Sequence, residues 1–120
     1  MALLAVSYPD LNAQDFEWIQ QLRARYDKRH HLIIRPHLTL VFPVDKIDRP
    51  RFVDHIHLIA ERTAIIMFVI NRALAVSTPT GDECHVFLVP DTGYSDIVSL
   101  HDSLYTGRLA GELKPDYPFV

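Results

Sequence analysis

The sequence contains one cysteine and no long apolar segment, and each of these absences excludes a class of protein. Cys84 has no partner within the chain, so a disulfide-stabilised scaffold is excluded. The longest apolar run covers residues 64–70, far fewer than the about 20 residues that a membrane-spanning helix needs. The first residues lack the basic flank of a secretory signal, so we expect a cytoplasmic protein without a membrane segment.

The composition is that of a folded domain. The chain has 120 residues, of which 48% are apolar, and its formal net charge is −3. This length suits one domain with its own core, and the modest charge together with abundant aromatic residues excludes a disordered chain. We therefore expect residues 1–120 to form a single domain.

Charge is distributed unevenly along the chain. Residues 23–37 contain five arginines and lysines but only one acid, Asp27, whereas the chain from residue 81 onward is strongly acidic. A basic segment in an acidic protein favours a local anion site over a broad nucleic-acid surface. The alternative is a solvated helix end with its usual basic residues.

Apolar periodicity and turn residues predict an α+β chain. Helical spacing of apolar residues predicts a helix over 14–27, and Asp48 before Arg49 and Pro50 has the pattern of a helix start. A turn at 79–82 joins two apolar, strand-like segments into a predicted hairpin. The predicted order is a strand at 3–7, a helix at 14–27, an extended segment at 32–42, a helix at 48–60, strands at 64–77 and 84–89, a helix from about Ser95 to Gly107, and an extended segment from residue 114.

One pattern occurs twice. Residues 4–10 and residues 86–91 are each an apolar strand that ends in Pro-Asp, each is followed by a helix, and the two prolines are 81 positions apart. A strand–helix unit used twice predicts a pseudo-symmetric fold with two lobes, one over about 1–80 and a partial one over about 81–120. Because Pro-Asp is also a common connection between a strand and a helix in α+β proteins, the pattern alone does not establish a duplication.

The clearest chemical motif is the tripeptide His37-Leu38-Thr39 within the extended segment. In a strand, His37 and Thr39 share one face about 6.7 Å apart, while Leu38, Leu40 and Phe42 share the opposite face with the core. The imidazole can act as a general acid or base near neutral pH, and the hydroxyl can hold a phosphate oxygen. The similar tripeptide at 101–103 falls within a predicted helix, where residues two apart do not face each other.

The stretch Pro36-His37-Leu38-Thr39-Leu40, with a strand and helix before it and a helix and strand after it, resembles the 2H phosphoesterase superfamily. That superfamily includes 2′,5′ RNA ligase-like proteins and 2′,3′-cyclic nucleotide phosphodiesterases. The resemblance implies a duplicated α+β fold with antiparallel sheets and outer helices, whose lobes each supply one H-x-T motif to a shared, metal-independent cleft. It implies that His37 is an acid/base, that Thr39 binds phosphate, and that the substrate is RNA or a nucleotide with a cyclic phosphate or a 2′,5′ linkage.

Other residues are weaker site candidates. Arg35 and Arg72 are candidates for phosphate binding, although exposed arginines are common on strands. Tyr8, Phe42 and Tyr117 are candidates for stacking on a base, with core packing as the alternative. No set of His, Cys or carboxylate residues has the spacing of a metal site, so we expect neither a metal nor another cofactor.

The second lobe departs from the family pattern. The counterpart of His37 falls near position 118, where the sequence is Tyr117-Pro118-Phe119-Val120 and holds no histidine. We expect the second lobe to be incomplete, with the chain ending just before its second motif. A complete chain that has lost the second site is the alternative.

Two other functions stay open at this point. One is a non-catalytic nucleotide or RNA-binding module that uses the basic segment 23–37. The other is an α+β interaction protein that forms a homodimer through an open sheet edge. Among the remaining residues, we expect Cys84 to be buried and His101 to lie on a helix surface.

Overall fold

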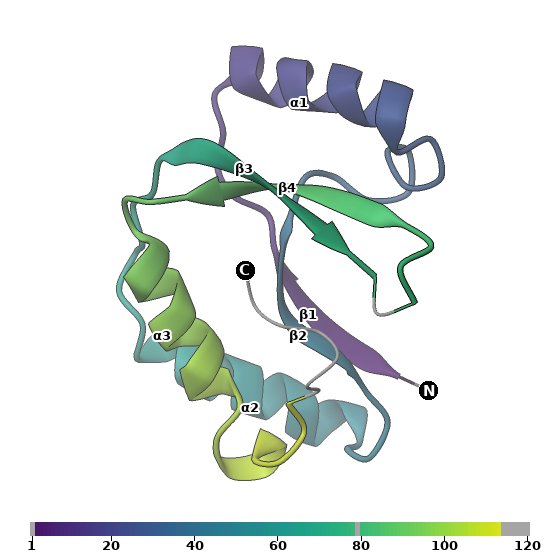
Figure 1. The fold of residues 1–120 in the computed structure, drawn as a ribbon. Helices are drawn as coiled ribbons and strands as arrows, with labels where there is room; N and C mark the ends of the chain where they lie inside the picture. Colours follow the sequence, from purple (N-terminus) through teal and green to yellow (C-terminus); the bar gives the residue numbers. More distant parts are fainter. Residues whose placement is uncertain (1, 79, 114–120) are drawn as a thin grey trace.

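The computed structural model describes residues 2–78 and 80–113, and this part of the chain has the predicted α+β architecture (Figure 1). Two antiparallel sheets of two strands each, β1–β2 and β3–β4, are combined with three α-helices. The predicted fold class, an incomplete duplicated β-α-β fold, is thereby confirmed. None of the described helices is both long enough and apolar enough to cross a membrane. The elements are β1 (Leu3–Ser7), α1 (Ala13–Tyr26), β2 (Leu38–Val44), α2 (Arg49–Glu61), β3 (Ile70–Ser77), β4 (Cys84–Pro90), α3 (Tyr94–Leu104) and the short 3₁₀ helix η1 (Gly107–Leu109).

The helices begin where local sequence signals place them. The side chain of Asn12 caps α1 by accepting a hydrogen bond of 2.8 Å from the N–H of Asp15. Asp48 caps α2, and Pro50 lies in its first turn, where the missing N–H has no cost. The third helix starts one residue before the predicted Ser95, with Gly93 as its N-terminal cap residue.

The repeated pattern in the sequence corresponds to a repeated pattern of structure. Strand β4 begins 81 residues after β1, and helix α3 begins 81 residues after α1. An offset that holds for both the strand start and the helix start favours a duplicated unit over a chance recurrence of the pattern. The boundaries of the two lobes stay a prediction.

The extended segment predicted over 32–42 is wrong in its first half. Residues 28–33 form turns, in which the N–H groups of Ile33 and Ile34 both donate to the carbonyl of His30. Strand β1 ends at Ser7, which pairs with Leu38, so no strand lies opposite the preceding residues. Backbone groups without a ladder partner form local hydrogen bonds instead, and β2 starts at Leu38.

Two bulges in β2 break its predicted alternation. Two residues of β1, Leu3 and Ala5, pair with Val44 and Val41, and the next residue, Val6, pairs with Thr39, so β2 holds an extra residue in each interval. Pro43 lies in the first of them, which suits a residue that cannot donate to the ladder. As a result Val41 is fully buried. Leu38 and Leu40 contact the core as predicted, but Phe42 is not among the residues that form or flank the core cluster.

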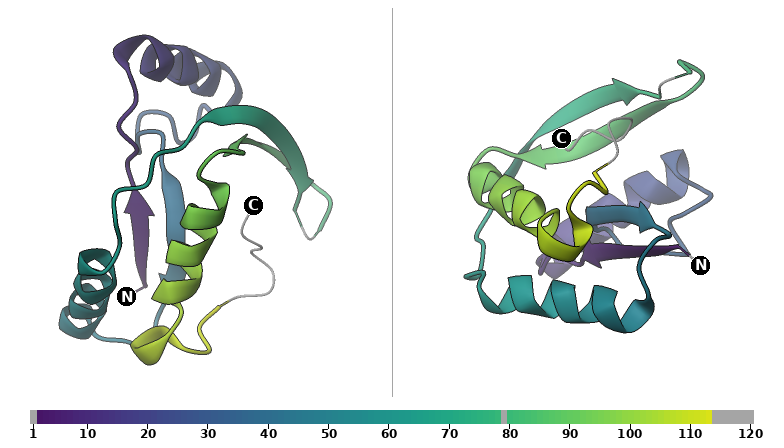
Figure 2. Two further views of the ribbon diagram at one scale, coloured as in Figure 1. Left: turned by 90° about the vertical axis from the view of Figure 1, so that its left-hand side faces the viewer. Right: turned by 90° about the horizontal axis from the view of Figure 1, so that it is seen from below.

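One apolar core joins β2, α2, α3 and η1. Helices α2 and α3 lie at the same end of the molecule, with α1 at the opposite end (Figures 1 and 2). On α2, the buried His55 uses its Nε2 to donate to the carbonyl of Leu104 at 2.9 Å, which ties α2 to the end of α3. The core cluster consists of Leu40, Val41, Val44, Phe52, Ile59, Ile97, Leu104 and Leu109.

Two sequence expectations about burial are wrong. His101 is 4% exposed, because it lies four residues after Ile97 and three before Leu104 and so shares their face of α3. Cys84 is exposed, because it opens β4 at the far end of a two-stranded hairpin that has few neighbours. That hairpin starts at Ile70 rather than 64, and its outer part leaves apolar side chains such as Val86 in solvent.

Candidate active site

His37 lies immediately before β2, and a backbone carbonyl selects the tautomer of its neutral ring. Its Nδ1 is 2.8 Å from the carbonyl oxygen of Arg35. A carbonyl oxygen can only accept a hydrogen bond, so Nδ1 carries a hydrogen. In the neutral imidazole, Nε2 then keeps its lone pair. This half-buried histidine is therefore arranged to accept a proton at Nε2.

Thr39 is the second residue of β2 and pairs with Val6 of β1. It is half-buried, as His37 is. The predicted tripeptide therefore straddles the start of the strand rather than lying wholly inside it. Leu38 alone separates His37 from Thr39 in the chain, so both residues lie at the end of the β1–β2 ladder where Ser7 pairs with Leu38.

Arg35 is also at this end of the ladder and rests on an aromatic ring. Its guanidinium carbon is 4.0 Å from the ring centroid of Tyr8, the residue that follows β1. This distance is well within the range of a cation–π contact. Among the described residues, no carboxylate forms an ion pair with Arg35. The positive charge of Arg35, two residues before His37 in the chain, is therefore not paired with a described acid.

The other candidates lie elsewhere. Phe42 is half-buried in the bulged part of β2, where its backbone N–H donates to the hydroxyl of Tyr105 at 3.0 Å. Tyr117 lies outside the described residues. Arg72 forms an ion pair of 2.7 Å with Asp91, so its charge is already partnered. The contact of Tyr105 had no signal in the sequence, because it depends on how the end of α3 packs against β2.

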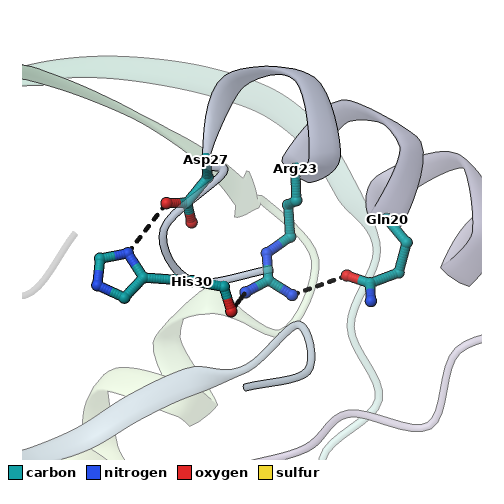
Figure 3. Close-up of polar contacts among 4 residues, drawn as sticks. All are labelled: Gln20, Arg23, Asp27 and His30. Carbon is teal, nitrogen blue, oxygen red and sulfur yellow. Dashed lines mark hydrogen bonds and ion pairs between the residues drawn. The ribbon is translucent and has the colours of Figure 1, made fainter. Parts of the chain in front are cut away.

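The basic segment divides into structural and exposed cations. Arg23 donates to the side chain of Gln20 at 2.8 Å and to the carbonyl of His30 at 3.4 Å (Figure 3). The ring of His30 in turn contacts Asp27 at 3.0 Å. These contacts fold the turn after α1 back onto the helix. Arg23 therefore serves the fold, while Arg35 is the cation of this segment that lies next to His37.

The described residues contain no group of three or more His, Cys, Asp or Glu side chains that could hold a metal ion. The candidate residues Arg35, His37 and Thr39 lie within residues 35–39, where β2 begins and pairs with the end of β1.

Comparison with known proteins identifies the family. The model of the 2′-5′ RNA ligase superfamily matches residues 9–120, which is nearly the whole chain. The chain therefore belongs to the 2′-5′ RNA ligase superfamily, within the 2H phosphoesterases.

A curated protein of Geobacillus sp. (strain WCH70), named "Putative phosphoesterase", is 30% identical to the chain over 115 residues. The alignment covers 94% of this chain and 61% of that relative, so the chain spans about three fifths of the relative's length. No solved structure matches the chain.

Proposed function

We propose that this chain forms part of a cytoplasmic, metal-independent phosphoesterase that acts on 2′,3′-cyclic phosphates or 2′,5′-linked nucleotides of RNA. The observation that carries the proposal is the hydrogen bond from His37 Nδ1 to the Arg35 carbonyl, two residues before Thr39 in the chain. Family membership and the name of the Geobacillus relative support phosphoester chemistry. The substrate class and the roles of the residues are our proposal.

In this mechanism the neutral His37 is the general base for one proton transfer. Its Nε2 takes a proton from the attacking water as the water oxygen bonds to phosphorus. The bond from phosphorus to one ribose oxygen breaks at the same time. The hydroxyl of Thr39 donates to a non-bridging phosphate oxygen, and the guanidinium of Arg35 binds the substrate phosphate through its N–H groups.

The departing ribose oxygen needs a proton from a second group on the other side of the phosphate. A single histidine performs half of this acid–base work. The repeat interval of 81 residues places the counterpart of His37 near position 118, outside the described residues. We propose that a second H-x-T motif supplies this proton in the full-length protein. The coding sequence downstream of Val120 tests this: a Pro-His-x-Ser/Thr pattern is expected within about ten codons, as the repeat interval requires.

The direct test is hydrolysis of a 2′,3′-cyclic nucleotide by the full-length protein in excess chelator. We expect His37→Ala to lower kcat by about a hundredfold or more, the usual contribution of a general base. Thr39→Val, which keeps the side-chain shape and removes the hydroxyl, is expected to lower kcat/KM. His57→Ala is the matched control, because His57 is an exposed histidine on α2. Turnover that is insensitive to His37→Ala would disprove the mechanism.

The assay also separates the alternative function. A non-catalytic RNA- or nucleotide-binding module would bind its ligand in a salt-sensitive manner without turnover, and His37→Ala would leave that binding unchanged. The exposed cations of residues 23–37 would then carry the affinity. We favour the enzyme, because a general base needs the hydrogen bond that fixes the ring of His37, whereas a purely electrostatic surface does not.

A further inference from the structure

The contact between Tyr8 and Arg35 is made by two short segments that are both stiffened by proline. Tyr8 precedes Pro9 and Arg35 precedes Pro36, and a residue before proline is restricted to extended conformations. Ser7 pairs with Leu38, so Tyr8 leaves one strand at the point where Arg35-Pro36-His37 enters the other. The ladder therefore brings Tyr8 opposite the segment that contains Arg35 and His37, and the Tyr8 ring contacts the Arg35 guanidinium.

We propose that Tyr8 is a positioning residue of the active site: its ring holds the Arg35 guanidinium beside His37, where it binds the substrate phosphate. This inference rests on the proposed function. Arg35 is exposed and has a long side chain, so in isolation it would lose considerable conformational entropy on binding a phosphate. Stacking on Tyr8 at 4.0 Å restricts the side chain beforehand.

The stacked geometry leaves the binding groups of the arginine available. A cation–π contact uses the flat face of the guanidinium, whereas phosphate is bound by the N–H groups at its edge. Because Arg35 has no carboxylate partner among the described residues, those N–H groups are not committed to an ion pair. Tyr8 therefore acts through Arg35 and does not itself need to touch the phosphate.

The chain offers a matched control for this contact. Arg25 lies over the ring of Tyr26 at 5.4 Å, also as an arginine–tyrosine pair, but near the end of α1 rather than beside His37. If any exposed arginine–tyrosine pair aided binding through general electrostatics, both pairs would contribute. If Tyr8 acts by positioning Arg35 at the site, only the first pair matters.

The experiment measures kcat and KM for a 2′,3′-cyclic nucleotide, together with dissociation constants for the 2′- and 3′-monophosphates that ring opening can yield. We expect Tyr8→Leu to raise KM and both dissociation constants about threefold with kcat retained, the size of an exposed cation–π contact. Tyr8→Phe keeps the ring face and is expected to restore binding. Arg35→Met is expected to weaken binding about tenfold, as loss of a charge-assisted hydrogen bond would. Tyr26→Leu should change neither constant.

The double variant Tyr8→Leu/Arg35→Met decides whether Tyr8 works through Arg35. We expect it to bind no more weakly than Arg35→Met alone. A further loss in the double variant, or normal binding by Tyr8→Leu, would overturn the positioning role while the phosphoesterase assignment stands. If the unsubstituted full-length protein neither turns over the cyclic nucleotide nor binds the monophosphates, the proposed function fails and this inference with it. The free energy of unfolding of each variant shows whether a loss reflects misfolding.

Discussion

The hydroxyl of Tyr105 accepts a hydrogen bond of 3.0 Å from the backbone N–H of Phe42, across 63 residues of sequence. Phe42 lies in the interval where β2 carries an extra residue, so its N–H is displaced from the regular ladder. The residue that follows α3 thus supplies an acceptor to the bulge of β2. This contact holds the second half of the chain against the strand that leads away from His37.

Loss of that hydroxyl should destabilise the fold measurably. Tyr105→Phe keeps the ring and removes the acceptor, so we expect the free energy of unfolding to fall by about 1 kcal/mol. Urea denaturation followed by circular dichroism measures the change. Tyr26→Phe is the control, because Tyr26 is 74% exposed and should change stability by less than about 0.5 kcal/mol. Equal values for the two variants would refute the role of the contact.

Two histidines on the same helix should differ sharply in their contribution to stability. His55→Ala removes the bond to the Leu104 carbonyl and leaves a cavity between α2 and α3, so we expect a loss of about 3 kcal/mol. His57 is exposed two positions further along, and His57→Ala should cost less than about 0.5 kcal/mol. Thermal or denaturant unfolding of the pair tests this. A small effect at His55 would contradict the packing of α2 against α3.

Alanine substitutions at two glycines with the same φ distinguish the cost of backbone strain from the cost of a steric clash. Gly93 and Gly111 both have φ of +83°, so Gly→Ala at either position should cost about 1 kcal/mol of backbone strain. At Gly93 a new Cβ would also collide with the carbonyl oxygen of Met67 and lie 2.8 Å from Cβ of Phe68, whereas nothing lies within 4 Å at Gly111. We therefore expect Gly93→Ala to lose about 2 kcal/mol more in unfolding free energy than Gly111→Ala. Similar losses would show that the segment before β3 does not pack against the start of α3.

We expect the exposed β3–β4 hairpin to promote self-association of the chain. Each described sheet has two strands and hence open edges, and Val86 on β4 is 68% exposed. We expect the average mass from light scattering to rise with concentration towards that of a homodimer, and Val86→Lys to suppress the rise. Val53→Lys places the same change on α2, where the valine is 40% exposed, and should leave association intact. A monomer at high concentration would exclude this mode of pairing.

Features specified by nearby residues could be predicted from the sequence. Asp48 and Pro50 mark the start of α2 within a few positions, and the spacing of Pro-Asp pairs anticipates the repeat. The start of β2 could not be predicted in the same way, because it depends on where β1 ends and on the hydrogen bonds of the turn after α1. The bulges around Pro43 could not be predicted either. A strict alternation of side chains would bury Phe42 and expose Val41, whereas in the bulged strand Val41 is fully buried.

In the candidate site, too, features set by nearby residues could be predicted and features set by contacts between segments could not. The spacing of His37 and Thr39 could be identified from the tripeptide, but the partner of Nδ1 could not, since it depends on the bend at Pro36. The stack of Arg35 on Tyr8 depends on the register between two strands, which no short window of sequence encodes. The burial of His101 could not be predicted, because a polar residue within an apolar stripe has the same spacing whether it is buried or exposed.

The acceptor that orients His37 belongs to the peptide backbone of residue 35, and every amino acid at that position carries it. The side chain at 35 can therefore be exchanged while the ring keeps its hydrogen on Nδ1. A saturation library at this codon would vary the charge, length and shape presented to a ligand and leave the base competent in each member. Substitutions at position 35 could therefore change ligand selectivity while the hydrogen bond that orients His37 is retained.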